Sequence, residues 1–242
     1  MPKYDIYLYD DCKVLKNKLN IKDEEALDLA EADLSRANMM ILYSSGFSDF
    51  SVKGICEIHK TLFEDVYDWS GKFRVINIQK REKILAGKSV WYSDCDLIEK
   101  DLKSIFGKIN KTDWKKLDKE FFVKKIAEYF SSIWQVHPFR EGNTRTVTML
   151  LAFFVENKGY YFDHDLIANS AGYFRDALVL ASLDKFSEYE HLERILNDAI
   201  CTEPIENTDE KEVSKTRKDK YEKYKYENYK PTSHEYLEKT EH

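Results

Sequence analysis

The stretch His137-Pro-Phe-Arg-Glu-Gly-Asn-Thr-Arg145 decides how this sequence is interpreted. Pro138 ends the helix predicted before it, because the residue that precedes a proline is pushed out of the α region. Apolar residues at helical spacing resume at Val147, so a second helix is predicted to begin within residues 141–144. The stretch is therefore a tight turn between two helices, with His137 at the end of the first.

This turn combines groups that handle phosphate. Gly142 lets the backbone turn freely, and the first N–H groups of the second helix lack intrahelical partners, which together with the helix dipole makes an anion site. Arg145 can grip phosphate oxygens with two parallel hydrogen bonds. Glu141 can hold Mg²⁺, which commonly takes one or two carboxylates plus substrate phosphates. His137 is placed to deprotonate a hydroxyl nucleophile.

Each of these residues, taken singly, has an ordinary structural role. A histidine before Pro-Phe is more often packed than catalytic, and Asn143 or Thr144 can simply cap the helix. The combination of a base, a metal ligand and a phosphate site within one turn is what favours catalysis.

Helical periodicity dominates the rest of the chain, with one exception. Asp23 is predicted to cap a helix over residues 24–40, another helix follows Ser51, and more are predicted from Asp96-Leu97 and over residues 119–135. In contrast, residues 73–79 alternate with β-branched residues, and a polar turn leads to residues 88–92. We predict a β-hairpin there. Because two strands alone are marginal, the hairpin must pack on the helices or be docked by something that it binds.

The composition indicates one soluble, mostly helical domain with an appendage. The chain has 242 residues, of which 43% are hydrophobic and 34% charged, and only eight are Gly and four Pro. The net charge of −6 does not indicate the basic face that nucleic acids require. No signal peptide or membrane-spanning stretch is visible, and the four cysteines are widely spaced without a Cys-x-x-Cys pair. We expect a cytoplasmic protein with reduced thiols and neither nucleic-acid nor membrane partners.

The composition changes near Cys201. Residues 202–242 carry charges of both signs and five tyrosines from Tyr221 to Tyr236, with almost no aliphatic side chains. Such a segment buries too little apolar surface to offset the entropy of ordering it. We predict a domain over residues 1–201 and a tail over residues 202–242 that is disordered or partly helical, with its tyrosines in solvent.

The turn resembles the signature His-x-Phe-x-Asp/Glu-Gly-Asn-x-Arg-x-x-Arg of the Fic (Fido) family. Six of the named positions match: His137, Phe139, Glu141, Gly142, Asn143 and Arg145. Residues 14–21 are similar to the family's opening segment, and residues 58–72 to its Ile-His-x-x-Leu-Phe-x-x-Val-Tyr-x-Trp-x-Gly-Lys pattern. The resemblance covers residues 14–200. It implies an all-α fold, a Fic-type helical bundle with an inserted β-hairpin flap and a mobile C-terminal tail.

The resemblance also implies an activity, the transfer of AMP from ATP to a Ser, Thr or Tyr hydroxyl of a target protein and of the enzyme itself, with release of pyrophosphate. His137 would be the general base and Glu141 the ligand of Mg²⁺. The expected nucleotide-binding residues are Arg140, Gly142, Asn143, Thr144, Arg145 and Lys80. The protein substrate would pair with the flap as an added strand. The oligomeric state stays open, and a homodimer is one possibility.

Two departures from the signature leave alternatives open. The last Arg of the signature falls on Thr148, which puts the usual grip on the γ-phosphate and the usual inhibitory contact in question, and the variable position holds Thr144. The alternatives are transfer of another nucleotide or phosphate group, removal of AMP, or a nucleotide-binding domain without catalysis. Thr202, Glu206 and Asn207 match the family's inhibitory pattern Ser/Thr-x-x-x-Glu-Gly/Asn, so autoinhibition is a hypothesis, against an ordinary acidic linker.

Overall fold

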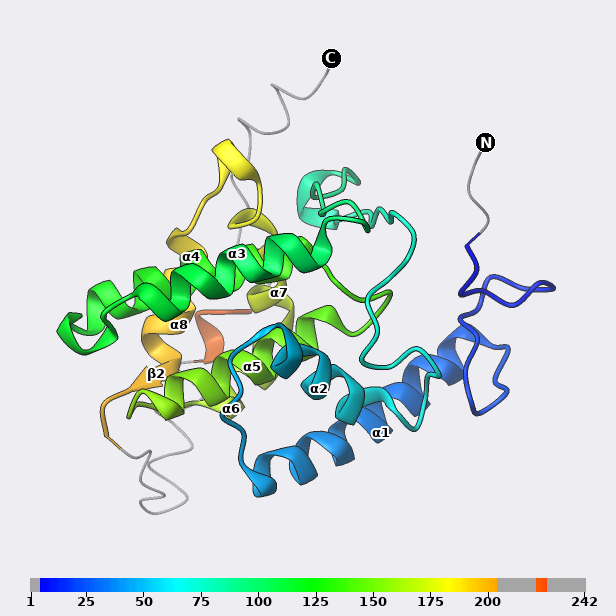
Figure 1. Cartoon of the computed structure of the whole chain (residues 1–242), viewed down its shortest axis with the longest axis horizontal. Helices are drawn as coiled ribbons and strands as arrows, with labels where there is room; N and C mark the ends of the chain where they lie inside the picture. The colour runs from blue at the N-terminus through cyan, green and yellow to red at the C-terminus, as the bar shows by residue number, and fades with distance from the viewer. Residues whose placement is uncertain (1–4, 204–220, 226–242) are drawn as a thin grey trace. The chain divides into compact units, whose positions relative to one another are not determined.

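The computed structural model describes residues 5–203 and 221–225, which are mainly helical (Figure 1). The α-helices are α1 (Glu24–Ser45), α2 (Val52–Phe63), α3 (Ile98–Lys111), α4 (Lys119–Val136), α5 (Asn143–Asn157), α6 (His164–Asn169), α7 (Ala171–Leu180) and α8 (Glu190–Ala199). Single 3-10 turns lie at η1 (Lys83–Leu85), η2 (Trp114–Lys116) and η3 (Asp184–Phe186). A short antiparallel sheet pairs β1 (Tyr161–Phe162) with β2 (Ile200–Cys201). The predicted helical class is confirmed.

The described chain forms two compact units. Unit 1 contains residues 5–78, 92–110 and 136–153, whereas unit 2 contains residues 79–91, 111–135, 154–203 and 221–225. His137 and the turn that follows it belong to unit 1. The candidate site is therefore described from the residues of unit 1.

Helix starts follow the capping residues in the sequence. The Asp23 carboxylate accepts from Ala26 N at 2.9 Å, and Ser51 Oγ accepts from Lys53 N and Gly54 N at 3.2 and 3.3 Å. These bonds satisfy amides that the first turn of a helix leaves without partners. The helices predicted after Asp23 and Ser51 are thus confirmed, as is the predicted cap at Asp23, and Ser51 also caps its helix.

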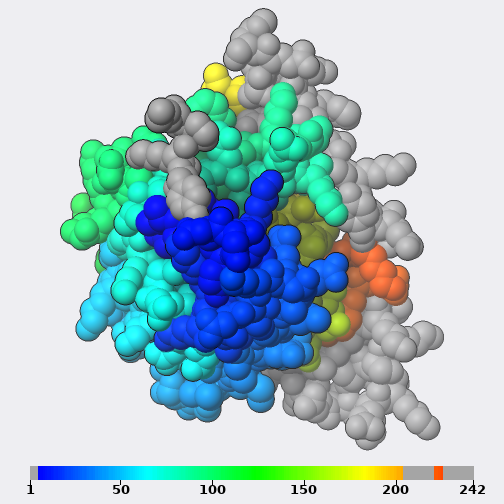
Figure 2. Space-filling model, turned by 90° about the vertical axis from the view of Figure 1, so that its right-hand side faces the viewer, coloured from blue at the N-terminus to red at the C-terminus, as the bar shows by residue number. Residues whose placement is uncertain are grey.

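The core of unit 1 forms where α1 packs along α2 (Figure 1). The apolar face of α2 is completely buried, with Ile55, Ile58, Leu62 and Phe63 all at 0% exposure. The segment before α1 is shown in dark blue in Figure 2, on the surface beside α1. Asn17 holds this segment in shape, because its side-chain amide donates to the carbonyls of Leu15 and Ile21 at 2.8 and 2.7 Å.

The predicted strands at residues 73–79 and 88–92 do not form, so this part of the prediction is wrong. Neither segment carries a ladder of backbone hydrogen bonds, and the first bends at Val75 and Ile76. Instead the Arg74 guanidinium donates to the carbonyls of Ile76 (2.8 Å) and Ser93, which lie at the two ends of the segment. Those carbonyls are satisfied without cross-strand amides, and an isolated two-stranded ribbon is marginal in any case. We keep the name flap for residues 77–92.

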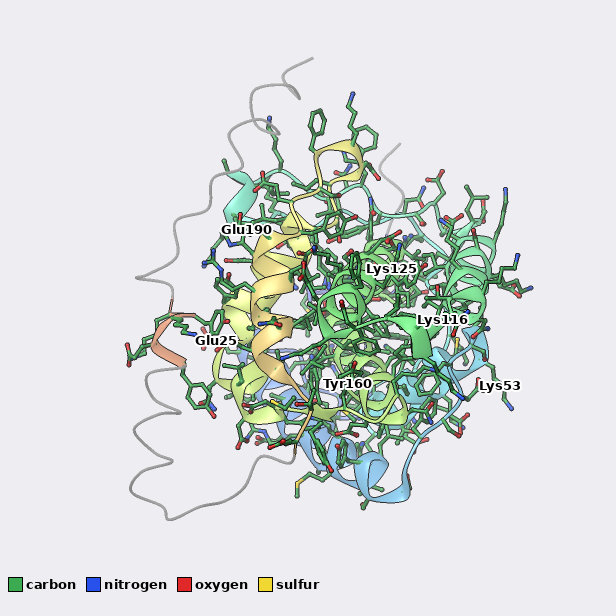
Figure 3. The ribbon with its side chains drawn as sticks, turned by 90° about the vertical axis from the view of Figure 1, so that its left-hand side faces the viewer. Glu25, Lys53, Lys116, Lys125, Tyr160 and Glu190 are labelled. Atoms are coloured by element: carbon green, nitrogen blue, oxygen red, sulfur yellow. The ribbon has the colours of Figure 1, made fainter. Side chains whose placement is uncertain are left out.

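Contacts between aromatic side chains and ion pairs hold elements of unit 2 together. Tyr160, labelled in Figure 3, packs on Phe122 with ring centroids 4.5 Å apart. Glu190, labelled in the same view, lies in the first turn of α8, where a negative charge complements the helix dipole. Within this unit the flap residue Glu82, 4% exposed, lies 2.8 Å from Nη2 of Arg175 on α7.

Part of the predicted tail, residues 221–225, is packed within unit 2. Tyr224 is 3% exposed, its hydroxyl donates to Asp198 Oδ2 at 2.7 Å, and its ring meets the edge of Tyr173 at 4.8 Å. The expectation that the tail tyrosines all face solvent is therefore wrong for Tyr224. Its phenol finds both an apolar wall and a hydrogen-bond acceptor on α7 and α8, which is the environment that a buried tyrosine needs. Residues 204–220 and 226–242 lie outside the described residues.

Two further expectations concern thiols and membranes. All four cysteines are free thiols. Among the helices of residues 5–203 and 221–225, none has both the length and the apolar character needed to cross a bilayer.

Candidate active site

The site begins where α4 ends. His137, directly after the last helical residue, has a left-handed backbone with φ of +49° and is 1% exposed. Such a conformation is uncommon for a residue with a side chain and persists only when the surroundings enforce it. The imidazole stacks on Tyr92 with ring centroids 4.0 Å apart and planes at 20°. The predicted base is thus at the predicted helix end, with one face of its ring covered.

The loop after His137 is closed by one side chain. Asn143, the first residue of α5 and 2% exposed, accepts from Phe139 N at 2.9 Å and donates to Phe139 O at 2.8 Å. This pair of bonds fixes residues 139–143 as a compact turn. The side chain of Asn143 is therefore engaged within the loop.

Gly142 brings the backbone against an aromatic ring. Its φ is +78°, and an added Cβ would lie closer than 3.0 Å to two ring carbons of Phe63. Only glycine avoids both the backbone strain and the overlap. The carbonyl of Gly142 accepts from Thr146 N and Oγ1, at 3.0 and 2.9 Å, which starts α5 directly behind the loop. The helix N-terminus expected for phosphate is confirmed in position.

His59 supports the loop from α2. It is 0% exposed, stacks on Phe139 with ring centroids 3.8 Å apart, and accepts from Gly71 N through Nδ1 at 2.8 Å. Nδ1 is therefore the unprotonated nitrogen, and Nε2 donates to Glu141 O at 3.1 Å. Burial lowers the pKa of His59 to about 3, so the ring is neutral near pH 7. His59 is thus a packed, hydrogen-bonded residue that is neutral near pH 7.

Arg145 is held by a carboxylate that the sequence reasoning did not find. Its Nη2 donates to Glu31 on α1, and its Nη1 donates to Ser35 Oγ at 2.7 Å. The Arg145 side chain is 32% exposed while that of Glu31 is 6% exposed. The Tyr67 hydroxyl donates to the other Glu31 oxygen, and burial together with that carboxylate raises the pKa of Tyr67. A signal did exist, since Glu31 and Ser35 lie one and two turns after Leu27 on the buried face of α1.

The remaining predicted nucleotide residues have other contacts. Arg140 forms an ion pair with Asp5 of the N-terminal segment, with Nη2 and Nε at 2.7 and 3.0 Å from Oδ2. Thr144 O accepts from Thr148 Oγ1 at 2.7 Å, so the position of the signature's last Arg holds a hydroxyl bonded within its own helix. Lys80 belongs to unit 2, where its backbone N–H donates to Ser89 Oγ at 3.2 Å.

The predicted inhibitory residues are only partly described. Thr202 is exposed at the end of the first described range. Glu206 and Asn207 lie outside the described residues, and autoinhibition through them stays a prediction.

Comparison with known proteins finds a family and several relatives that this chain resembles. Residues 49–155 match the model of the Fic/DOC family. The probable protein adenylyltransferase y4lH of Sinorhizobium fredii is 29% identical over 173 residues, which cover 71% of this chain and 84% of the relative. The protein adenylyltransferase VbhT of Bartonella schoenbuchensis is 28% identical, but the matched part is 75% of this chain and only 36% of VbhT.

A solved structure shares the fold. The BepC protein of Bartonella tribocorum, determined with bound AMPPNP, superposes with a TM-score of 0.70 at 21% identity and covers 82% of this chain and 97% of that one. At this level of identity the likeness concerns the fold. The family-model match over residues 49–155 includes α2, the loop after His137 and most of α5, the elements that carry the site.

Proposed function

This chain belongs to the Fic/DOC family, and we propose that it is a protein adenylyltransferase that transfers AMP from ATP to a Ser, Thr or Tyr hydroxyl of a target protein. The observation that carries the proposal is the turn from His137 to Arg145. A buried imidazole, a carboxylate, a glycine-started helix N-terminus and a guanidinium follow one another there, in the order of the family signature. Two curated relatives with the name protein adenylyltransferase and the nucleotide-bound BepC fold support it.

The chemistry assigned to His137 is proton removal. In the proposed reaction the imidazole takes the proton of the target hydroxyl, the hydroxyl oxygen forms a bond to the α-phosphorus, and the bond from that phosphorus to the bridging oxygen breaks, so that pyrophosphate leaves. Removal of such a base typically costs 10²–10⁴-fold in rate. Since the His137 side chain is 1% exposed, a target hydroxyl reaches it only after covering residues move.

The phosphates are assigned to α5 and Arg145. The first amides of α5 and its dipole favour negative charge in front of the helix. Arg145 is the arginine of the turn with the most accessible side chain, at 32% against 17% for Arg140. To bind phosphate it must share or exchange its contact with Glu31. The nucleotide therefore competes with a carboxylate for the same guanidinium.

Glu141 is the residue that would hold Mg²⁺. Its Oε1 accepts from Gly142 N at 3.1 Å, which keeps the carboxylate beside the N-terminus of α5. One carboxylate fits this cation, because Mg²⁺ completes its shell with water and phosphate oxygens. Within the described ranges no cluster of three or more His, Cys, Asp or Glu offers an all-protein site. When bound, the cation would neutralise charge on the phosphates of the nucleotide.

The flap is the segment to which we assign the target protein. Trp91, within the flap, is 74% exposed and offers a large apolar side chain to a partner. An extended peptide could cover Trp91 while pairing with backbone groups of the flap that carry no strand ladder. We also assign the protein to the cytoplasm, where its four cysteines stay reduced.

A transfer assay tests the proposal. The parent protein, Mg²⁺ and ATP labelled at the α-phosphate should label the protein itself or a lysate protein with AMP, whereas His137→Ala should lose at least 100-fold of the label. His164→Ala, at a half-buried histidine of unit 2, is the matched control and should label like the parent. Equal labelling by His137→Ala would contradict the mechanism, and label from the γ-phosphate would indicate a kinase reaction.

One alternative rests on a specific observation. Thr148 places a hydroxyl, already bonded to Thr144 O, where the family signature has its last Arg. A domain that binds ATP but does not transfer AMP is therefore the second candidate. Calorimetry that shows ATP binding, together with no label from α-labelled ATP in any lysate, would favour it over catalysis.

A further inference from the structure

Arg74 is a buried cation that the family signature does not include. Its side chain is 1% exposed, and its guanidinium donates only to oxygen atoms of unit 1. Nε donates to His137 O at 2.8 Å, Nη1 to Ile76 O at 2.8 Å, and Nη2 to Ser93 O. One planar group thus joins three separate segments: the turn with the predicted base, the residue before the flap and the residue after it.

In the described part of the chain Arg74 forms no salt bridge, although the negative charge of Asp94 favours its protonated form. Among the described residues, no Asp or Glu oxygen lies within 4.0 Å of this guanidinium, and burial lowers the pKa of Arg74. A buried charge is expensive unless its hydrogen bonds are satisfied, and here backbone carbonyl dipoles satisfy them. A neutral apolar residue would avoid that cost. The arrangement indicates that the donor geometry of the guanidinium, rather than stability alone, accounts for an arginine at this position.

Arg74 also forms hydrogen bonds directly after the left-handed backbone of His137. Besides the bond from Nε to His137 O, the backbone N–H of Arg74 donates to Pro138 O at 2.9 Å. The two consecutive carbonyls after α4 are thus held by the same residue. His137 has φ of +49°, a conformation that costs about 1–3 kcal/mol and needs external support. Arg74 supplies that support on the carbonyl side of the residue.

The same guanidinium defines the base of the flap. Ile76 O and Ser93 O are separated by the whole flap in sequence, and both accept from Arg74. Asn77 adds a second tie between the two ends, since it donates to Asp94 Oδ1 at 2.8 Å and accepts from Cys95 N at 2.7 Å. A movement of either end of the flap therefore changes the hydrogen bonds of the group that holds the His137 peptide.

We propose that Arg74 is a positioning residue for AMP transfer, which fixes the backbone of His137 and ties it to both ends of the flap. The proposal rests on the proposed function, because it assigns to Arg74 the task of aligning the base with a hydroxyl docked at the flap. Arg74 does not touch the phosphate groups in this assignment. It acts on the rate of transfer and not on ATP affinity.

Arg74→Lys is the test variant, since it keeps the charge but can no longer reach His137, Ile76 and Ser93 at once. We expect kcat to fall about 10- to 100-fold, as for a small misplacement of a catalytic group, while KM for ATP stays within twofold. Arg36→Lys makes the same change on the exposed side of α1 and should match the parent in both constants. A parent-like kcat in folded Arg74→Lys overturns the proposal, and so does an equal loss in kcat and ATP affinity.

A spectroscopic measurement separates this proposal from the proposed function. The ring signal of His137, identified by its absence from the spectrum of His137→Ala, should shift and broaden in Arg74→Lys but not in Arg36→Lys. This holds even if the parent transfers no AMP, in which case the proposed function fails and the positioning role is still tested. An unchanged His137 signal in folded Arg74→Lys overturns it.

A second variant covers the case in which Arg74→Lys fails to fold. Asn77→Ala keeps Arg74 but removes the tie between Asn77, Asp94 and Cys95. If flap and base are coupled as proposed, the His137 ring signal should shift in this variant too, and kcat should fall with unchanged KM for ATP. A parent-like spectrum and a parent-like kcat in Asn77→Ala overturn the coupling.

Discussion

Gly142→Ala should damage this protein more than a glycine substitution at any open left-handed position. Two effects add at Gly142. Its φ of +78° is a conformation that a residue with a Cβ adopts only with strain, and the new methyl group would overlap two ring carbons of Phe63 and lie 3.1 Å from a third. Phe63 is 0% exposed, so the ring has little room to withdraw. The substitution therefore stresses the loop that presents the helix N-terminus.

The magnitude follows from the two effects separately. The left-handed backbone costs a non-glycine residue about 1–2 kcal/mol. Overpacking a buried site by one methyl group costs about 1–3 kcal/mol more. We expect Gly142→Ala to lower the free energy of unfolding by about 2–5 kcal/mol, a large share of the 5–15 kcal/mol that typical domains possess.

Gly159 offers a matched control. It has φ of +88°, and an added Cβ would meet nothing within 4 Å. Gly159→Ala therefore carries the backbone strain alone, and we expect a loss of about 1–2 kcal/mol. Denaturant unfolding of the two variants and the parent measures both values. The AMP-transfer assay should show a large loss for Gly142→Ala and little change for Gly159→Ala.

The difference between the two variants is the decisive quantity. If Gly142→Ala is destabilised no more than Gly159→Ala, the ring of Phe63 does not confine the loop, and the account of the turn is wrong. A partial rescue provides a second check. Phe63→Leu should recover part of the stability lost in Gly142→Ala, because it removes the overlapping ring edge while the strained φ remains.

Two more predictions concern the charges around the turn. Glu31→Gln removes the negative charge that holds Arg145 and one of the two acceptor oxygens, so ATP should bind several-fold tighter in calorimetry, while unfolding should become easier by about 1–3 kcal/mol because either Arg145 or Tyr67 loses its acceptor; weaker ATP binding would contradict competition for Arg145. His59 has its pKa lowered from 6.5 to about 3, so the unfolded chain binds the extra proton below pH 6.5 and stability falls as the pH falls. From pH 7.5 to 5.0 the parent should lose about 2 kcal/mol more in denaturant unfolding than His59→Gln; equal losses would show that His59 is not buried in its neutral form.

Local signals in the sequence were sufficient for helices α1 to α5 and for the turn before α5. Asp23 and Ser51 cap the helices predicted from them, and Pro138 and Gly142 end one helix and start the next. Each of these features depends on residues within one or two turns of the chain. The signature then added roles that spacing alone left ambiguous, as for His137.

The parts that were missed depend on contacts between distant residues. Glu31 and Arg145 are separated by 114 positions, and Arg74 and His137 by 63. Helical spacing places Glu31 on the buried face of α1, but it does not reveal which distant residue a buried side chain will contact. The prediction of strands in the flap was wrong for a related reason. Alternation of apolar and polar residues predicts that every second side chain is buried, but it does not predict the partners of the backbone hydrogen bonds. Ile76 is buried and Val75 exposed as alternation requires, yet the carbonyl of Ile76 is bonded to an arginine.

The surroundings of the arginines decide which of them can meet a nucleotide. Arg74 is 1% exposed and committed to backbone carbonyls, so it can hold the turn but cannot bind a ligand without breaking it. Arg140 is paired with Asp5 and its side chain is 17% exposed. Arg145 is more open and bonded to Glu31, a partner that phosphate oxygens can replace in kind. If phosphate replaced Glu31 as the partner of Arg145, the Tyr67 hydroxyl would still donate to Glu31. Nucleotide binding would then depend on how much more strongly the Arg145 guanidinium binds phosphate oxygens than the Glu31 carboxylate.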